Sequence, residues 1–214
     1  MTISAHDVSI PPMGILKKIS FSIFLFLIIH IEARPISYSG GSTIMSMSDN
    51  MKDSIYYHYS PTYKYSVGIE SVNDKFFDKD YIYLRFTYLL NRKNTKNSQR
   101  NLYFQSAISP DDLNENFYGI HGDWETRRLF TGFGYKRVIN NIQDFAEQYY
   151  QVGIAPYIGE YGDFHTWMML KSKKNSLIGD WITYPVLKFF KGDFLVEIGY
   201  DSDLDWDIHM MYRF

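Results

Sequence analysis

The chain has 214 residues, of which 22 are Lys or Arg and 24 are Asp or Glu, giving a net charge of -2. This balance gives no reason to expect nucleic acid as a partner, because nucleic-acid-binding domains concentrate positive charge. Cysteine is absent, so a disulfide framework is excluded and other interactions must hold the fold. The 19 Tyr and 16 Phe residues suit aromatic girdles at two membrane interfaces, although a soluble β-sandwich can be equally aromatic.

The N-terminal part of the chain has the pattern of a secretory signal. A short basic start at residues 13–18 precedes an apolar run at residues 19–29, and Ala33 offers a small residue for cleavage before Arg34. The run is too short to span a bilayer, which needs about 20 residues. We therefore expect residues 1–33 to be an N-terminal extension and cleaved signal peptide, with a buried helix as the alternative. The true start is either Met1 or Met13.

After the signal, apolar and polar residues alternate with a period of two, which predicts half-buried β-strands. The predicted strands are residues 42–48, 54–59, 63–70, 81–90, 101–108, 117–125, 129–137, 149–157, 164–172, 181–190, 194–200 and 204–214. The total of about twelve is even, as expected of a single-chain membrane barrel. Residues 34–214 are thus predicted to form one domain.

The connections between these strands sort into two alternating sets. One set is short or basic: residues 60–62, 126–128, 159–162 and 191–193, together with a longer segment at 91–100. The other set is longer and often acidic: residues 72–80, 109–116, 139–147, 172–180 and 201–203. Short turns at one end and longer loops at the other are typical of outer-membrane barrels.

The last strand shows the alternation most clearly. One face carries Leu204, Trp206, Ile208, Met210, Tyr212 and Phe214, and the other carries Asp205, Asp207, His209, Met211 and Arg213. We expect the first of these faces to contact lipid, because an apolar edge ending on Phe214 would be unprotected in a soluble sheet.

The signal, the alternation and the ending through Met210, Tyr212 and Phe214 resemble bacterial outer-membrane β-barrel proteins of the porin-like kind, over essentially the whole mature chain. Residues 30–47 and the run at 123–128 also look like an uncharacterised proteobacterial group of such barrels. The resemblance implies an all-β fold, a closed up-and-down antiparallel transmembrane barrel in the outer membrane, with both termini in the periplasm. It also implies two partners: outer-membrane lipid, and the barrel-assembly machinery, which would read the C-terminal strand ending in Phe214.

With the outward face assigned, polar residues of both charges fall on the lumen side. We expect Arg85, Lys188, Glu197, Asp207 and His209 to line a narrow pore for small polar solutes or ions, because charges along a pore select what passes. The alternative is that these groups form ion pairs and hydrogen bonds that fill a narrow barrel, since buried charges need partners.

Four histidines, His58, His121, His165 and His209, also take the lumen phase and are weak candidates for copper or zinc binding. Scattered hydrogen-bonding histidines are the default interpretation, and no cofactor is expected.

Two functions of other classes stay open. Asp207 and His209 lie two apart on one face, a spacing at which a carboxylate can orient an imidazole for outer-membrane hydrolysis. An enzyme is less favoured than a pore, because no serine-bearing motif accompanies the pair. The other alternative is a soluble periplasmic ligand-binding β-barrel with the aromatic residues in its core. The acids and arginines at 123–128 are interpreted as a salt-bridge cluster at a turn rather than a glycosidase carboxylate pair.

Overall fold

The computed structural model describes residues 35–158, 163–203 and 205–214. The predicted signal peptide, both candidate starts, the predicted turn at 159–162 and Leu204 lie outside the described residues. No helix in the described part of the chain is long and apolar enough to span a bilayer.

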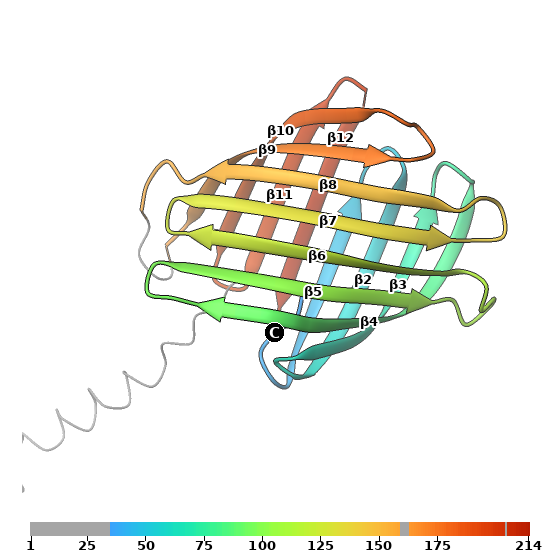
Figure 1. Ribbon diagram of the computed structural model, residues 1–214, viewed down its shortest axis with the longest axis horizontal. Helices are drawn as coiled ribbons and strands as arrows, with labels where there is room; N and C mark the ends of the chain where they lie inside the picture. Colours follow the sequence, from blue (N-terminus) through green and yellow to red (C-terminus); the bar gives the residue numbers. More distant parts are fainter. Residues whose placement is uncertain (1–34, 159–162, 204) are drawn as a thin grey trace, which may run out of the picture. The chain divides into compact units, whose positions relative to one another are not determined.

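The described residues form twelve strands that close into one antiparallel barrel. The strands are β1 (Gly41–Ser48), β2 (Lys52–Thr62), β3 (Tyr65–Asp74), β4 (Lys79–Asn94), β5 (Ser98–Ile108), β6 (Asn116–Thr126), β7 (Leu129–Ile139), β8 (Phe145–Ile154), β9 (His165–Asn175), β10 (Trp181–Lys191), β11 (Phe194–Asp201) and β12 (Asp205–Arg213). Figure 1 shows β4 to β8 crossing the front of the barrel, with β2, β3, β11 and β12 behind them at another tilt. The all-β class, the up-and-down order and the number of strands predicted from the alternation are confirmed.

Successive side chains of a strand point to opposite faces, so each strand contributes one set to the lumen and one to the outside. On β2, Ser54, Tyr56 and His58 are buried, whereas Ile55 and Tyr57 between them are exposed. On β2 the outer face is therefore apolar, while the inner face combines polar groups with the Tyr56 ring.

The barrel closes by pairing its first and last strands, with Ile44 opposite Tyr212. The Ser42 amide donates to the Phe214 carbonyl at 2.7 Å, and the Phe214 amide donates to the Ser42 carbonyl at 2.9 Å. An even number of antiparallel strands brings both ends of the wall to one rim, here called the terminal end. The opposite rim, which carries the connection 49–51 and its equivalents, is called the loop end.

Two predicted connections were wrong. The segment 91–100 is not a long loop, because β4 continues to Asn94 and β5 begins at Ser98. Residues 60–62 belong to β2, where a register irregularity admits Pro61, and such positions tolerate a residue without an amide donor. The strand predicted at 149–157 is displaced toward the N-terminus, because β8 begins at Phe145 and ends at Ile154.

The two connection errors share a physical cause. The strand ends that extend beyond the apolar belt carry polar residues on both faces, as in residues 91–100, so they lose the alternation that marks a strand.

Candidate functional site

The lumen holds charged and aromatic side chains in contact with one another. Arg85 on β4 donates from Nη1 to Glu70 Oε2 at 2.8 Å and from Nη2 to Gln105 Oε1 at 3.1 Å. Its guanidinium lies 4.0 Å from the ring centroid of Tyr56, a cation-π contact that offsets part of the cost of burying the charge. Arg85 is thus held on the inner face by partners on β2, β3 and β5.

A second group of charges runs along the wall formed by β10, β11 and β12. Lys188, Glu197 and His209 are register neighbours on these three strands. Lys188 Nζ lies 3.1 Å from Glu197 Oε1, and His209 Nδ1 lies 3.8 Å from Glu197 Oε2. Glu197 is therefore the acceptor that both basic neighbours share.

Asp207 receives its partners from farther round the barrel. Lys171 Nζ on β9 lies 2.6 Å from Asp207 Oδ2, and the Tyr184 hydroxyl on β10 donates to the same oxygen. Both side chains reach past β11, where Gly199 leaves the inner face open. A Cβ at Gly199 would lie 2.7 Å from the Tyr184 ring, so the absence of a side chain there makes the reach possible.

These contacts bear on the hydrolase alternative. The carboxylate of Asp207 is bound by Lys171 and Tyr184, while His209 faces Glu197 through Nδ1. Asp207 therefore does not orient His209, and the Asp–His arrangement needed to activate a nucleophile is not present in this geometry.

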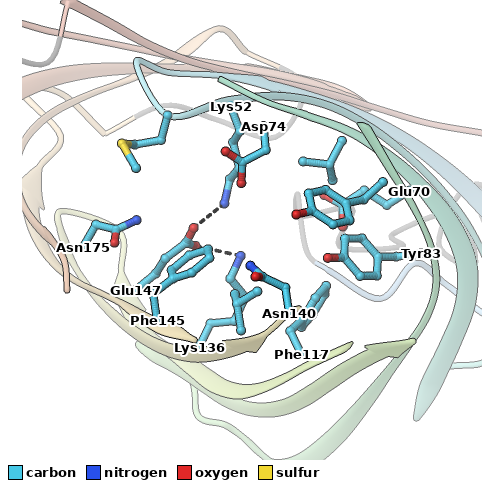
Figure 2. Close-up of a pocket in the computed structure, with 14 residues that line it drawn as sticks. Lys52, Glu70, Asp74, Tyr83, Phe117, Lys136, Asn140, Phe145, Glu147 and Asn175 are labelled. Atoms are coloured by element: carbon cyan, nitrogen blue, oxygen red, sulfur yellow. Dashed lines mark hydrogen bonds and ion pairs between the residues drawn. The ribbon is translucent and has the colours of Figure 1, made fainter. Parts of the chain in front are cut away.

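At the loop end, five charged residues form ion pairs, some of which cross the lumen. They are here called the loop-end network: Asp49, Lys52, Lys136, Glu147 and Lys173. Lys52 Nζ lies 2.6 Å from Glu147 Oε1, and Lys136 Nζ lies 2.7 Å from Glu147 Oε2. Strands β2 and β8, which carry Lys52 and Glu147, lie opposite each other in the ring of strands. Figure 2 shows Lys52 reaching from one wall to Glu147 on the other, with Lys136 beside it.

A second link of the network joins the β1–β2 connection to β9, because Lys173 pairs with Asp49. Burial alone would raise the pKa of the Asp49 carboxyl, but the ammonium groups of Lys173 and Lys52 outweigh it, and the pKa lies below the ordinary 3.8. Asp49 is therefore ionised at neutral pH. Its carboxylate also accepts bonds from the Met51 and Lys52 amides, both at 2.9 Å, which fix the turn that presents Lys52.

The space left beside this network is small. A cavity of about 40 Å³ is lined by residues of the network together with Glu70, Tyr83, Phe117 and Asn140. Such a volume holds at most a few water molecules. The loop-end network is thus a constriction of the lumen.

The terminal end is occupied differently. Residues 35–40, here called the N-terminal segment, precede β1. Ile36 is 2 % exposed and packs against Leu89 and Tyr103 on the inner wall. The Ser37 amide donates to Ser60 Oγ at 2.9 Å. This segment therefore lies within the terminal mouth.

The five residues predicted to line the pore all lie on the inner face, each in contact with the partners described above. The four histidines stand on four different strands, and His121 stacks on Tyr103 with ring centroids 4.9 Å apart. Among the described residues, no group of three or more His, Asp or Glu side chains is placed to hold a metal ion. The four candidate histidines are thus dispersed over the wall of the barrel.

Sequence reasoning missed the loop-end network and the N-terminal segment. Lys52 lies two residues from the inward-facing Ser54, and Glu147 lies four residues from the inward-facing Gln151. The alternation of residues therefore predicts that both side chains point into the lumen. That they meet depends on strands distant in sequence. Ile36 carried no signal beyond being apolar.

The predicted lipid-facing residues lie on the outer face of β12. Trp206, Met210, Tyr212 and Phe214 are exposed and Ile208 is half-buried. The soluble binding-barrel alternative places the aromatic residues in the core. Tyr103 and Tyr184 are indeed buried inside the barrel, whereas Trp206, Tyr212 and Phe214 stand exposed on its outer face.

No family model and no curated protein matches this chain. Among solved structures, the chain is similar to a KdgM porin in complex with disordered oligogalacturonate, with a TM-score of 0.52 and 13% sequence identity. The match covers 81% of this chain and 99% of the porin chain. The chain therefore has a porin-like β-barrel fold.

Proposed function

We propose that the protein is an outer-membrane β-barrel that forms a narrow pore for small polar solutes or ions, with a resting state constricted at both mouths. The observation that carries the proposal is the loop-end network, in which Lys52 and Glu147 pair across the lumen at 2.6 Å. Ion pairs that cross a lumen close it while they hold and leave a charged path when they part.

The two faces of the wall support the outer-membrane location. Apolar side chains cover the outside, and the inside combines charged and polar groups with buried aromatic ones such as Tyr103 and Tyr184; an apolar outer face is typical of a barrel solvated by lipid. The predicted signal peptide supports export, and outer-membrane lipid is the expected surrounding. The terminal end then faces the periplasm, and the strand ending in Phe214 is the expected contact of the barrel-assembly machinery.

Passage through the lumen would follow the charges described above. Arg85, Lys188, Glu197, Asp207 and His209 would line the path, and their mixed signs favour polar solutes over apolar ones. The KdgM porin, which shares the fold, binds an oligogalacturonate, and this supports a polar solute for a barrel of this shape.

The test is single-channel conductance of the protein purified from membranes, in a planar bilayer with a detergent-only control. We expect small, reproducible steps from the wild type and larger or more frequent steps from Lys52→Ala. Silence from both, in barrels that shift on a gel when heated and are thus folded, would overturn the pore.

A further inference from the structure

The outer face of the barrel carries a groove at the terminal half of β5 to β8. Its volume is about 610 Å³, which is in the range of ligand-binding pockets. Its outward-facing lining is mainly apolar and aromatic, with Leu102, Trp124, Phe133, Tyr150 and Val152. These side chains stand on four neighbouring strands, so the groove runs across the sheet.

The sheet is hollow at this place for a local reason. Gly122 occupies the outward position between Leu102 and Phe133, and a Cβ there would lie 2.8 Å from the Phe133 ring. The floor is therefore backbone and the small Thr131, while Trp124 and Tyr150 rise on either side.

Positive charge gathers at the same rim. Lys93 and Arg100 are exposed and lie opposite each other in register, and Arg100 lies opposite Trp124 on the next strand. Lys96 in the adjacent turn and Arg127 and Arg128 in the β6–β7 turn are also exposed. Neither Lys93 nor Arg100 has an ion-pair partner within residues 35–158, 163–203 and 205–214.

The acids of this region face the other way. Asp123 points inward from β6, and its Oδ1 accepts a hydrogen bond from the side-chain nitrogen Nδ2 of Asn101 at 2.7 Å. Glu125 follows it by two residues and shares that phase. The run at 123–128 is therefore divided, with its acids directed to the lumen and its arginines exposed in the β6–β7 turn.

We propose that this groove binds an anionic glycerophospholipid, whose acyl chain lies along the aromatic walls and whose phosphate is bound by Arg100 and Lys93. Guanidinium groups bind phosphate oxygens in a bidentate manner, and basic clusters beside a membrane attract anionic lipids. The inference rests on the proposed membrane location, because only there does the groove face lipid. Because the terminal end faces the periplasm in that arrangement, the ligand comes from the phospholipid leaflet.

The experiment measures lipid retention by native mass spectrometry on the full protein purified from membranes. The probes are dioleoyl phosphatidylglycerol, dioleoyl phosphatidylcholine and soluble glycerol 3-phosphate. We expect the wild type to bind phosphatidylglycerol about thirtyfold more tightly than phosphatidylcholine, since Lys93 and Arg100 each contribute about 1 kcal/mol and every 1.4 kcal/mol is tenfold. Glycerol 3-phosphate should not compete.

Variants locate the binding. The double variant Lys93→Gln with Arg100→Gln should retain phosphatidylglycerol no more tightly than phosphatidylcholine. Lys64→Gln with Lys191→Gln is the matched control, because it removes the same charge from exposed positions at the same rim, in the β2–β3 turn and at the end of β10. Thr131→Trp, which fills the groove without changing charge, should weaken both lipids.

Equal retention of the two lipids by the wild type, or equal losses in both charge variants, would overturn the site. Competition by glycerol 3-phosphate would reduce it to a phosphate contact and also overturn a lipid groove. Failure of the proposed membrane location appears separately, as a wild type that does not insert into vesicles as a heat-modifiable barrel, and failure of the pore appears as silence in the conductance test.

Discussion

The two mouths of the barrel are occupied by different kinds of contact. At the loop end, charged side chains from opposite walls pair across the lumen, as Lys52 does with Glu147 and Lys173 with Asp49. At the terminal end, the N-terminal segment enters the mouth and buries Ile36 against Leu89 and Tyr103.

The difference concerns what each closure responds to. Ion pairs weaken with added salt when water reaches them and with any change in the charge of a partner. Apolar burial is insensitive to charge and depends on the area removed from water. The loop end is thus suited to opening in response to solutes or ions, while the terminal end opens when the segment leaves its site.

The largest effect is expected from removing Glu147, which two lysines share. Glu147→Ala leaves Lys52 and Lys136 inside the lumen without their carboxylate, and loss of one partner of a buried pair costs about 3–5 kcal/mol. Urea unfolding of the protein in lipid vesicles measures this loss in the free energy of unfolding.

The matched control is Asp144→Ala, which removes a carboxylate at the same end of the barrel from an exposed pair with Arg137 at 3.2 Å. Exposed pairs contribute about 0–1 kcal/mol. If both variants lose the same small amount, Glu147 is solvated and the loop-end network does not close the mouth.

The next effect concerns the terminal mouth. Ile36→Ala removes apolar contacts with Leu89 and Tyr103, at a cost of about 2 kcal/mol, the lower end of the range for buried isoleucines. We expect larger conductance steps, because the segment then leaves the mouth more often. Added salt should not reproduce this change. Steps identical to those of the wild type would show that Ile36 does not obstruct the path.

A smaller effect, on ion selectivity, is expected from changing the charges on the wall between the two mouths. Changing Glu197 and Asp207 together to Ala removes two carboxylates and leaves Lys188 and Lys171 without their acceptors. The lumen becomes more positive, so the reversal potential in a salt gradient should move in the anion-selective direction. An unchanged reversal potential would place the conducting path elsewhere.

The smallest expected effect is a rise in conductance at low pH, caused by protonation of Asp49 at the loop end. The pKa of Asp49 is lowered in the folded protein from the ordinary 3.8. Its contribution to stability is therefore fully present above that value and is lost as the pH falls through the lower folded pKa. Conductance should rise only in that acid range.

In Asp49→Asn this acid-dependent component should be absent, because the pair with Lys173 can no longer be broken by protonation. A rise already complete near neutral pH would point to a different titrating group.

The alternation of residues was enough to predict the course of most strands. The strand predicted at 194–200 is β11 to within one residue, and that at 129–137 lies within β7. The predictions were wrong where polar residues occupy both faces, as at 91–100, because beyond the apolar belt both faces meet water. For the candidate site, the period of two gave the direction of Arg85 and Glu197, but not their partners.

By itself, the sequence determined the class of fold, the number of strands and the face on which each strand residue lies, because these depend on a local period of two. The tertiary structure alone decided which inward residues meet. Lys52 and Glu147 are brought together by the closing of the ring, and Tyr184 and Asp207 by the open position at Gly199. Ion pairing across a lumen depends on distances between strands far apart in the chain, and no local pattern encodes those distances.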